Sequence, residues 1–221
     1  MQKRAARTRR TLVSAAACEF DRSGYAGASL VRIARSAGIS VGALTFHFSS
    51  KEQLAEVVRA KGHEATVALV ERVRARQEAP LESVVTLTLG LAGLLEADLC
   101  VRAAARLTRD LPGCTPDWKS AWVPAISEYL RRLEGGSATG PVTDSLTGSA
   151  TGPLTDSVSD PAALTVLATH LVAGVEADLR RRAGQEQDPD GRTAAQLARI
   201  WELVLGGRAG GSGGFRSRGA D

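Results

Sequence analysis

The stretch from Ser29 to Lys51 constrains the fold of this chain more than any other, because two short helical patterns meet there at a tight turn. Apolar residues at helical spacing predict one helix that ends before Gly38 and a second that opens at Ser40 and is anchored by Leu44 and Phe48. Gly38 can adopt the left-handed backbone conformation that a tight helix–helix turn needs. The pattern is typical of a helix-turn-helix (HTH) unit, whose second helix commonly enters the major groove of DNA.

The rest of the chain is also predicted to be helical, and it contains no strand pattern of useful length. We therefore expect an all-α fold with about nine helices. A helix from about Thr8, as its N-cap, to Ser23, ended by Gly24, would complete a three-helix HTH domain over residues 1–50, with the motif at about 29–48. The later helices are expected at about 50–76, 81–98, 101–110, 117–134, 161–183 and 192–205, in a second domain over residues 51–207.

Basic residues are concentrated at the N-terminal end of the chain. Residues 1–60 carry ten Lys or Arg and four Asp or Glu, a net +6, whereas the whole chain has a net charge of +4. A basic surface that coincides with a helix-turn-helix pattern predicts contact with double-stranded DNA.

Nothing in the sequence indicates export or membrane insertion. Apolar runs look too short or too polar to span a bilayer, and the basic start leads into an amphipathic helix instead of an apolar signal segment. We expect a cytoplasmic protein with no membrane partner. The three cysteines, Cys18, Cys100 and Cys114, lie far apart and outside any Cys/His cluster, so we expect no metal site and no cofactor.

A tandem duplication interrupts the helical pattern. The sequence SATGPVTDSLTG at 137–148 is followed at once by SATGPLTDSVSD at 149–160, and eight of the twelve positions are identical. Such Gly-, Pro-, Ser- and Thr-rich sequence buries too little apolar surface to order itself, so a disordered loop insertion is predicted at 137–160. The Gly-rich residues 208–221 are predicted to form a disordered tail.

Several motifs between Thr8 and Lys51 occur together in one known family. The segments TRRTLVSAAACEF, GYAGASLVRIARSAGIS and VGALTFHFSSKEQL resemble the N-terminal DNA-binding domain of TetR-family transcriptional regulators. Gly42–Phe48, Gly24–Ser29, and Asp117-Trp118 with Leu130–Arg132 are most similar to γ-butyrolactone receptors and their pseudo-receptor relatives. The resemblance implies a homodimeric repressor on a pseudo-palindromic operator, released by a small signalling molecule that is γ-butyrolactone-like or antibiotic-like, and controlling secondary metabolism.

The predicted recognition helix departs from the family at two positions, since Val41 stands where Lys is usual and Thr45 where Tyr is usual. Both family residues commonly contact DNA. In this chain small residues would let the backbone approach the groove floor, and Val41 and Thr45 would make methyl contacts with thymine. Phosphate contacts are expected from helix N-termini, from Lys51 and from the basic arm Arg4–Arg10.

Other roles stay open for some of these residues: a solvated helix face for Arg32 and Arg35, and packing beside Phe46 or a backbone hydrogen bond for His47. The predicted DNA-binding residues are Arg9, Ser29, Arg32, Ser40, Val41, Gly42, Ala43, Thr45, His47 and Lys51.

The second domain is expected to hold the small-molecule effector. Trp118 and Trp122 are four positions apart and are predicted to share one helical face, and a pair of tryptophans suggests a pocket wall in a chain with 4% aromatic residues. The resemblance places Trp118 over the ligand, whereas core packing is the alternative for each tryptophan. The predicted effector-binding residues are Trp118, Trp122, Leu91, Leu95, Val172 and Val175.

Dimerisation is expected through the last two helices, which would form a four-helix interface with a second copy, although some of their apolar positions must belong to the core of the protomer. Effector binding would tilt the helix at 50–76 and change the separation of the two recognition helices.

Two functions are alternatives to a ligand-released repressor. An enzyme is disfavoured, because the histidines His47, His63 and His170 lack a nearby Ser/Asp partner or metal-ligand spacing, and because no GxSxG, P-loop, GxGxxG or HExxH motif occurs. A DNA-binding regulator that has lost its ligand, or that answers to a protein partner, stays open.

Overall fold

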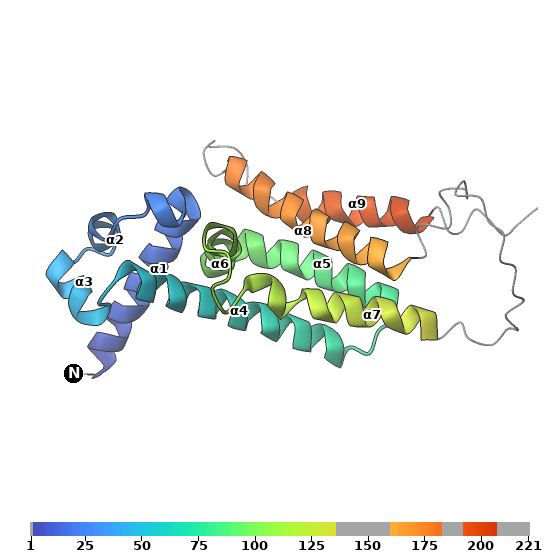
Figure 1. Cartoon of the computed structure of the whole chain (residues 1–221), viewed down its shortest axis with the longest axis horizontal. Helices are drawn as coiled ribbons and strands as arrows, with labels where there is room; N and C mark the ends of the chain where they lie inside the picture. Colours follow the sequence, from blue (N-terminus) through green and yellow to red (C-terminus); the bar gives the residue numbers. More distant parts are fainter. Residues whose placement is uncertain (1, 136–159, 183–191, 207–221) are drawn as a thin grey trace, which may run out of the picture.

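The computed structural model describes residues 2–135, 160–182 and 192–206, and these ranges contain nine α-helices and one 3-10 turn (Figure 1). The all-α prediction is confirmed, and no strand occurs among the residues so described. The duplicated segment up to Ser159 and the C-terminal tail lie outside the described residues. The elements are α1 Gln2–Gly27, α2 Leu30–Ser36, α3 Val41–His47, α4 Lys51–Ala75, α5 Pro80–Ala97, α6 Leu99–Asp110, η1 Trp118–Ala121, α7 Val123–Gly135, α8 Pro161–Arg182 and α9 Arg192–Gly206.

Helix α1 begins earlier than expected. Thr8 is not an N-cap but lies inside the helix, where its hydroxyl donates to the carbonyl oxygen of Arg4 at 3.1 Å. The preceding sequence QKRAAR consists of good helix formers, so nothing stops the helix at Thr8. Gly24 breaks the helix as predicted, with φ 70° and ψ 177°, and a last turn follows it to Gly27.

The turn between α2 and α3 forms as the sequence predicts. Gly38 has a positive φ of 70°, and the Ser40 hydroxyl caps α3 by accepting from the backbone N–H of Ala43 at 3.1 Å. Leu44 and Phe48 are fully buried in the N-terminal core, together with Phe20 of α1. Helix α3 is therefore fixed by its inner face, while its outer face stays free.

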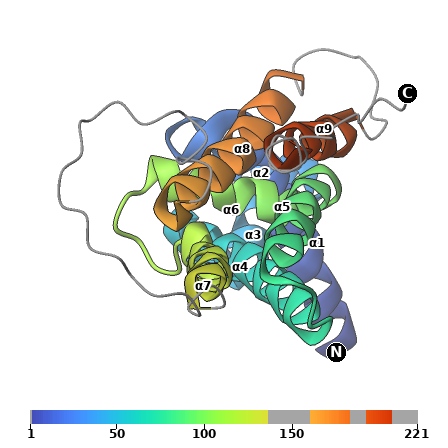
Figure 2. The same ribbon diagram turned by 90° about the vertical axis from the view of Figure 1, so that its right-hand side faces the viewer.

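Helices α4 to α9 form an elongated bundle next to this N-terminal unit (Figure 1). Helix α5 lies in the middle of the bundle, with α8 and α9 on one side and α4 and α7 on the other (Figure 2). Helix α6 crosses the junction and packs chiefly on α4 and α1. It is thus the element that joins the bundle to the N-terminal unit.

Two helices, α5 and α8, have the length and the mean hydropathy, 1.3 and 1.4, of a membrane-spanning segment. The expectation that every apolar run is too short or too polar was therefore wrong for these two. In the fold, α5 contacts α4, α6, α7, α8 and α9.

The helix expected at 117–134 is divided. A 3-10 turn covers Trp118–Ala121, Trp122 has a non-helical backbone (φ −134°, ψ −30°), and α7 starts at Val123. Pro124 explains the break, because its ring has no N–H to donate to the Ser120 carbonyl and would clash with that carbonyl in a continuous helix. The two tryptophans therefore do not lie on one α-helical face.

Candidate nucleic-acid interface and effector core

The outer face of α3 carries small side chains. Val41, Gly42, Ala43 and Thr45 are exposed, and no atom lies within 4 Å of the place where a Cβ on Gly42 would stand. The Thr45 hydroxyl donates to the Gly42 carbonyl oxygen at 3.0 Å, which leaves the methyl group as its outward feature. A flat surface of this kind allows a close approach of the helix backbone to a groove of DNA.

Phe46 is the functional candidate that sequence reasoning missed. Its side chain is 86% exposed on α3, more than any other large apolar residue of the described chain. Its ring lies edge to face with that of its neighbour His47, with the ring centroids 5.5 Å apart. The signal was available: Leu44 and Phe48 face inward, so a residue midway between them on a short helix faces outward.

Arg9 supports the recognition helix instead of standing free. One terminal nitrogen of its guanidinium donates to the backbone carbonyl oxygen of His47 at 3.2 Å, and the group lies 4.3 Å from the centroid of the Phe48 ring. Both contacts are at the C-terminal end of α3. Arg9 therefore connects α1 to α3, while its side chain stays exposed.

Lys51 is half-buried and is held by contacts within the protein. Its ammonium donates to the carbonyl oxygens of Tyr25, at 2.9 Å, and Ala28, at 3.4 Å, and lies 4.4 Å from the Tyr25 ring centroid. Next to it, the Tyr25 hydroxyl donates to the Glu52 carboxylate. This bond lowers the pKa of Glu52 to about 2, and burial together with Glu52 raises the pKa of Tyr25 to about 12. The cluster joins the end of α1 to the start of α4.

Arg32 forms an ion pair, which neither of its two sequence-based roles included. Its Nε lies 2.6 Å from a carboxylate oxygen of Glu19, which is buried and also pairs with Arg22 at 2.8 Å. Ser29 occupies the N-cap position of α2, but its side chain makes no capping bond.

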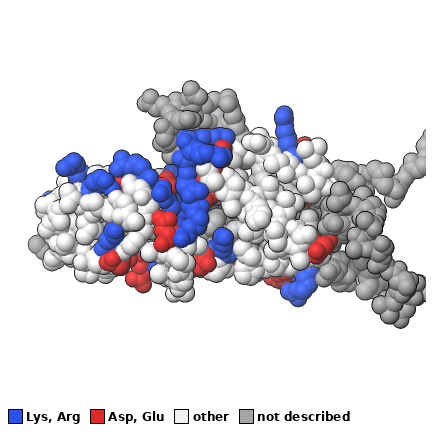
Figure 3. Space-filling model, turned by 45° about the horizontal axis from the view of Figure 1, so that its top comes forward, with Lys and Arg blue, Asp and Glu red and all other residues white. Residues whose placement is uncertain are grey.

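A basic groove opens beside the recognition unit. Lys3, Arg4 and Arg7 of α1 line it together with Ala37 and Ile39 of the turn, and its volume is about 520 Å³. Figure 3 shows Lys and Arg side chains gathered over the N-terminal unit and its junction with the bundle, and few of them farther along the bundle. The predicted basic arm is thus a helical surface and not an extended tail.

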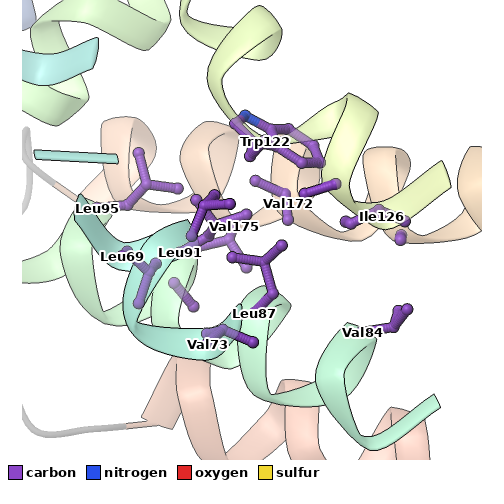
Figure 4. Close-up of a cluster of buried hydrophobic side chains, with 14 of the residues drawn as sticks. Leu69, Val73, Val84, Leu87, Leu91, Leu95, Trp122, Ile126, Val172 and Val175 are labelled. Atoms are coloured by element: carbon purple, nitrogen blue, oxygen red, sulfur yellow. The ribbon is translucent and has the colours of Figure 1, made fainter. Parts of the chain in front are cut away.

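The six residues predicted to bind an effector lie in one buried apolar cluster between α5, η1, α7 and α8. Figure 4 labels five of them, namely Leu91, Leu95, Trp122, Val172 and Val175. Trp118 and Trp122 are neighbours despite the break in their helix, with ring centroids 5.6 Å apart and a 58° tilt. The Trp118 indole N–H is already used, because it donates to the Thr66 hydroxyl oxygen at 2.8 Å.

Charged side chains of α6 link the two halves of the molecule. Arg102 pairs with Asp21 of α1 at 2.9 Å, and Arg106 donates to the Asp21 carbonyl oxygen at 2.6 Å. Arg109 pairs with both carboxylate oxygens of Glu176 on α8, a residue that is buried. A displacement of α8 would therefore be transmitted to α1 through these side chains of α6.

Helices α8 and α9 present apolar side chains outward. Val166 and Leu203 are exposed, and a groove of about 400 Å³ runs between the two helices, with Leu171, Leu197 and Ile200 in its walls. This is the face on which the sequence predicts a second copy of the chain.

Comparison with known proteins agrees with this arrangement. Residues 12–58 match the bacterial regulatory proteins of the tetR family. The A-factor receptor protein of Streptomyces griseus is 36% identical over 142 residues, which are 64% of this chain and 48% of that protein. The chain thus matches about half the length of this curated relative.

Solved structures extend the similarity to the bundle. A γ-butyrolactone receptor (ArpA-like protein) superposes with a TM-score of 0.67 at 27% identity, covering 92% of this chain and 89% of that one. CprB from Streptomyces coelicolor, solved in complex with its biological operator sequence, gives a TM-score of 0.66 at 27% identity, covering 91% and 88%. The chain is therefore a TetR-like protein that resembles the γ-butyrolactone receptors in its N-terminal domain and in its overall fold.

Proposed function

We propose that this protein is a DNA-binding transcriptional repressor that acts as a homodimer on a pseudo-palindromic operator. The observation that carries the proposal is the outer face of α3, which exposes small side chains and one large aromatic ring on a helix fixed from behind by Leu44 and Phe48. Because the proteins similar to this chain are regulators and receptors, we propose a regulatory role and no catalytic one, acting in the cytoplasm.

The geometry supports a division of labour among the predicted DNA-binding residues. Ser40, Val41, Gly42, Ala43, Thr45 and Phe46 lie where a helix can meet base edges. Phosphate contacts come from the basic groove of Lys3, Arg4 and Arg7, and from the Ser29 hydroxyl at the start of α2. Arg9, Arg32 and Lys51 act mainly by holding α3 and its neighbours in position.

Release from DNA by a small molecule is the second part of the proposal. The likeness to γ-butyrolactone receptors supports a lactone-like effector, received by the apolar cluster around Trp118 and Trp122. Its entry would shift α8 and α7 and act on the N-terminal unit through α6 and α4.

A ligand-blind regulator is the second candidate, and one observation favours it. The six predicted effector-binding residues are packed into a continuous core, as they would be in a protein that binds no effector.

We further propose that the operator lies upstream of the protein's own gene, so a gel-shift assay on that region tests both candidates. We expect saturable binding to a palindrome and its loss when a γ-butyrolactone with an alkyl chain is added. Absence of binding to any palindrome there would contradict autoregulation, and binding that no lactone relieves would favour the ligand-blind regulator.

A further inference from the structure

Helix α3 lacks the side chains that most recognition helices use to read bases. Its seven residues, Val41–His47, include no Arg, Lys, Asn, Gln, Asp or Glu. These are the residues that distinguish bases in the major groove through hydrogen bonds to the base edges. A helix without them has to recognise its site by other contacts.

The two hydroxyl groups of this segment are bound to the helix itself. The Ser40 hydroxyl oxygen accepts from the backbone N–H of Ala43 at 3.1 Å, and the Thr45 hydroxyl donates its proton to the Gly42 carbonyl oxygen at 3.0 Å. The remaining polar side chain, that of His47, is half-buried at the C-terminal end of the helix. The outer face of α3 therefore offers few groups for hydrogen bonding to bases.

Apolar groups, in contrast, are concentrated on the HTH unit. Six large apolar side chains are exposed in the described part of the chain, and three of them, Val31, Val41 and Phe46, lie on α2 and α3, which have only seven residues each. Ala43 and the methyl group of Thr45 add smaller apolar surface on α3. Exposure that is concentrated in this way marks a site of interaction.

The surroundings favour DNA over a protein as the partner. The basic groove of Lys3, Arg4 and Arg7 reaches the turn between α2 and α3, since Ala37 and Ile39 also line it. Positive charge next to the apolar face suits a polyanion. The apolar group that DNA presents in the major groove is the C5 methyl group of thymine, and a methyl group on C5 of cytosine occupies the same place.

We propose that α3 recognises its operator through the C5 methyl groups of pyrimidines, with Val41, Thr45 and Phe46 as the specificity-determining residues, so that 5-methylcytosine can replace thymine at the contacted positions. This inference rests on the proposed function, because it specifies the feature of the operator that the same helix reads. It goes beyond the two methyl contacts expected from the sequence, since the Thr45 hydroxyl is already engaged and Phe46 extends the apolar face.

Modified duplexes test the inference with the full-length protein. A duplex is first selected by the protein from a pool of random sequences, and each thymine of its half-sites is then replaced by deoxyuridine, which keeps the base pair and removes only the methyl group. We expect the dissociation constant to rise about fourfold for each contacted methyl group and to stay unchanged at the other thymines. Replacing a contacted T·A pair by C·G should weaken binding, and 5-methylation of that cytosine should recover most of the loss.

Variants of exposed residues assign the contacts without disturbing the fold. Thr45→Ser removes one methyl group and keeps the hydroxyl that binds Gly42, Val41→Ala removes two methyl groups, and Phe46→Ala removes the ring. In each variant we expect deoxyuridine at one particular thymine to lose its effect, because the side chain that contacts that methyl group is absent, and such non-additivity is the sign of a direct contact. Val67→Ala, at an exposed apolar residue of α4, is the matched control and should keep every deoxyuridine effect.

The outcomes separate this inference from the proposed function. If a duplex is selected but deoxyuridine changes nothing, or 5-methylcytosine binds no better than cytosine, the methyl inference is wrong and the repressor stands. If the deoxyuridine effects persist in all three variants, the methyl groups act through the shape of the DNA and the assignment to α3 is wrong. If no duplex is selected at all, the repressor proposal fails and the inference with it, and the apolar face of α2 and α3 then belongs to a protein partner.

Discussion

At the scale of single residues, the junction of the two halves leaves little room for a side chain at Gly24. A Cβ at this position would stand 2.7 Å from a carboxylate oxygen of Asp110 and 2.9 Å from a guanidinium nitrogen of Arg106. The backbone is also in the positive-φ region, at 70°. The adjacent N–H of Tyr25 donates to the same Asp110 carboxylate at 2.7 Å.

We expect Gly24→Ala to destabilise the protein by about 2 kcal/mol, because a positive φ strains alanine and because Asp110 must move away from the Tyr25 N–H that it accepts from. Gly38→Ala is the matched control, because Gly38 has the same φ of 70° but open space around it. Its cost should stay near 1 kcal/mol. Urea denaturation of both variants measures the difference, and equal losses would show that the contacts with Asp110 and Arg106 are unimportant.

Phe46 permits a test that separates DNA binding from folding. We expect Phe46→Ala to weaken operator binding about tenfold, through the loss of apolar contact with DNA, and to leave the thermal unfolding midpoint unchanged because the ring is exposed. Val67→Ala removes an exposed apolar side chain from α4 and should alter neither quantity. Operator affinity equal to that of the wild type would exclude Phe46 from the interface.

At the scale of elements, the cluster of Tyr25, Lys51 and Glu52 fixes the angle at which α4 leaves the N-terminal unit. Its hydrogen bonds connect the first turn of α4 to Tyr25 in the last turn of α1 and to Ala28 just after that helix. The hydrogen bond between Tyr25 and Glu52 also makes the stability of the fold depend on pH. The Glu52 pKa is about 2 in the fold and 4.5 as a free side chain, so the folded state favours the ionised form.

The resulting stabilisation is present above pH 4.5 and is lost as the pH falls through the folded pKa of about 2. We therefore expect Glu52→Gln to flatten the dependence of stability on pH between these values. Glu56→Gln, an exposed position on the same helix, is the control. Urea midpoints measured from pH 6 down to pH 2 provide the comparison, and parallel curves for Glu52→Gln and the wild type would refute the assignment.

At the scale of the whole molecule, the proposed second copy would cover the exposed apolar side chains of α8 and α9. We expect Leu203→Glu to raise the dissociation constant of the dimer at least tenfold, because it places a charge in an apolar interface. Val67→Glu, outside these helices, should leave the dimer intact. Analytical ultracentrifugation measures both, and a monomeric wild type would contradict the four-helix interface.

The sequence predicts the helices and the HTH unit well because their signals are local. Ser40 caps its own helix and Gly38 makes its own turn, so no distant residue is needed to recognise them. In contrast, whether a side chain is already engaged in a hydrogen bond depends on residues that lie far from it in the sequence. Lys51 is held by Tyr25 and Ala28, and Trp118 by Thr66, pairings that no periodicity reveals.

Other differences arise from overlooked local chemistry. Pro124 splits the expected helix at 117–134, and the helix-forming residues before Thr8 lengthen α1. The predicted effector cluster is brought together by the fold, although its common helical face was wrong. The expected loop at 137–160 stays a prediction, except that its last residue, Asp160, caps α8 by accepting from the Ala162 N–H at 2.8 Å.

The position of α6 has a consequence for protein engineering. Ala103 and Leu107 of this helix are buried in the same core as Phe20 and Leu44, so the N-terminal core is completed by a segment that lies fifty residues beyond the HTH motif. A graft that ends at residue 50 would leave that core open. A transplantable DNA-binding module of this protein must therefore include α6, and a chimera is best built by exchanging the matching helix along with α1–α4.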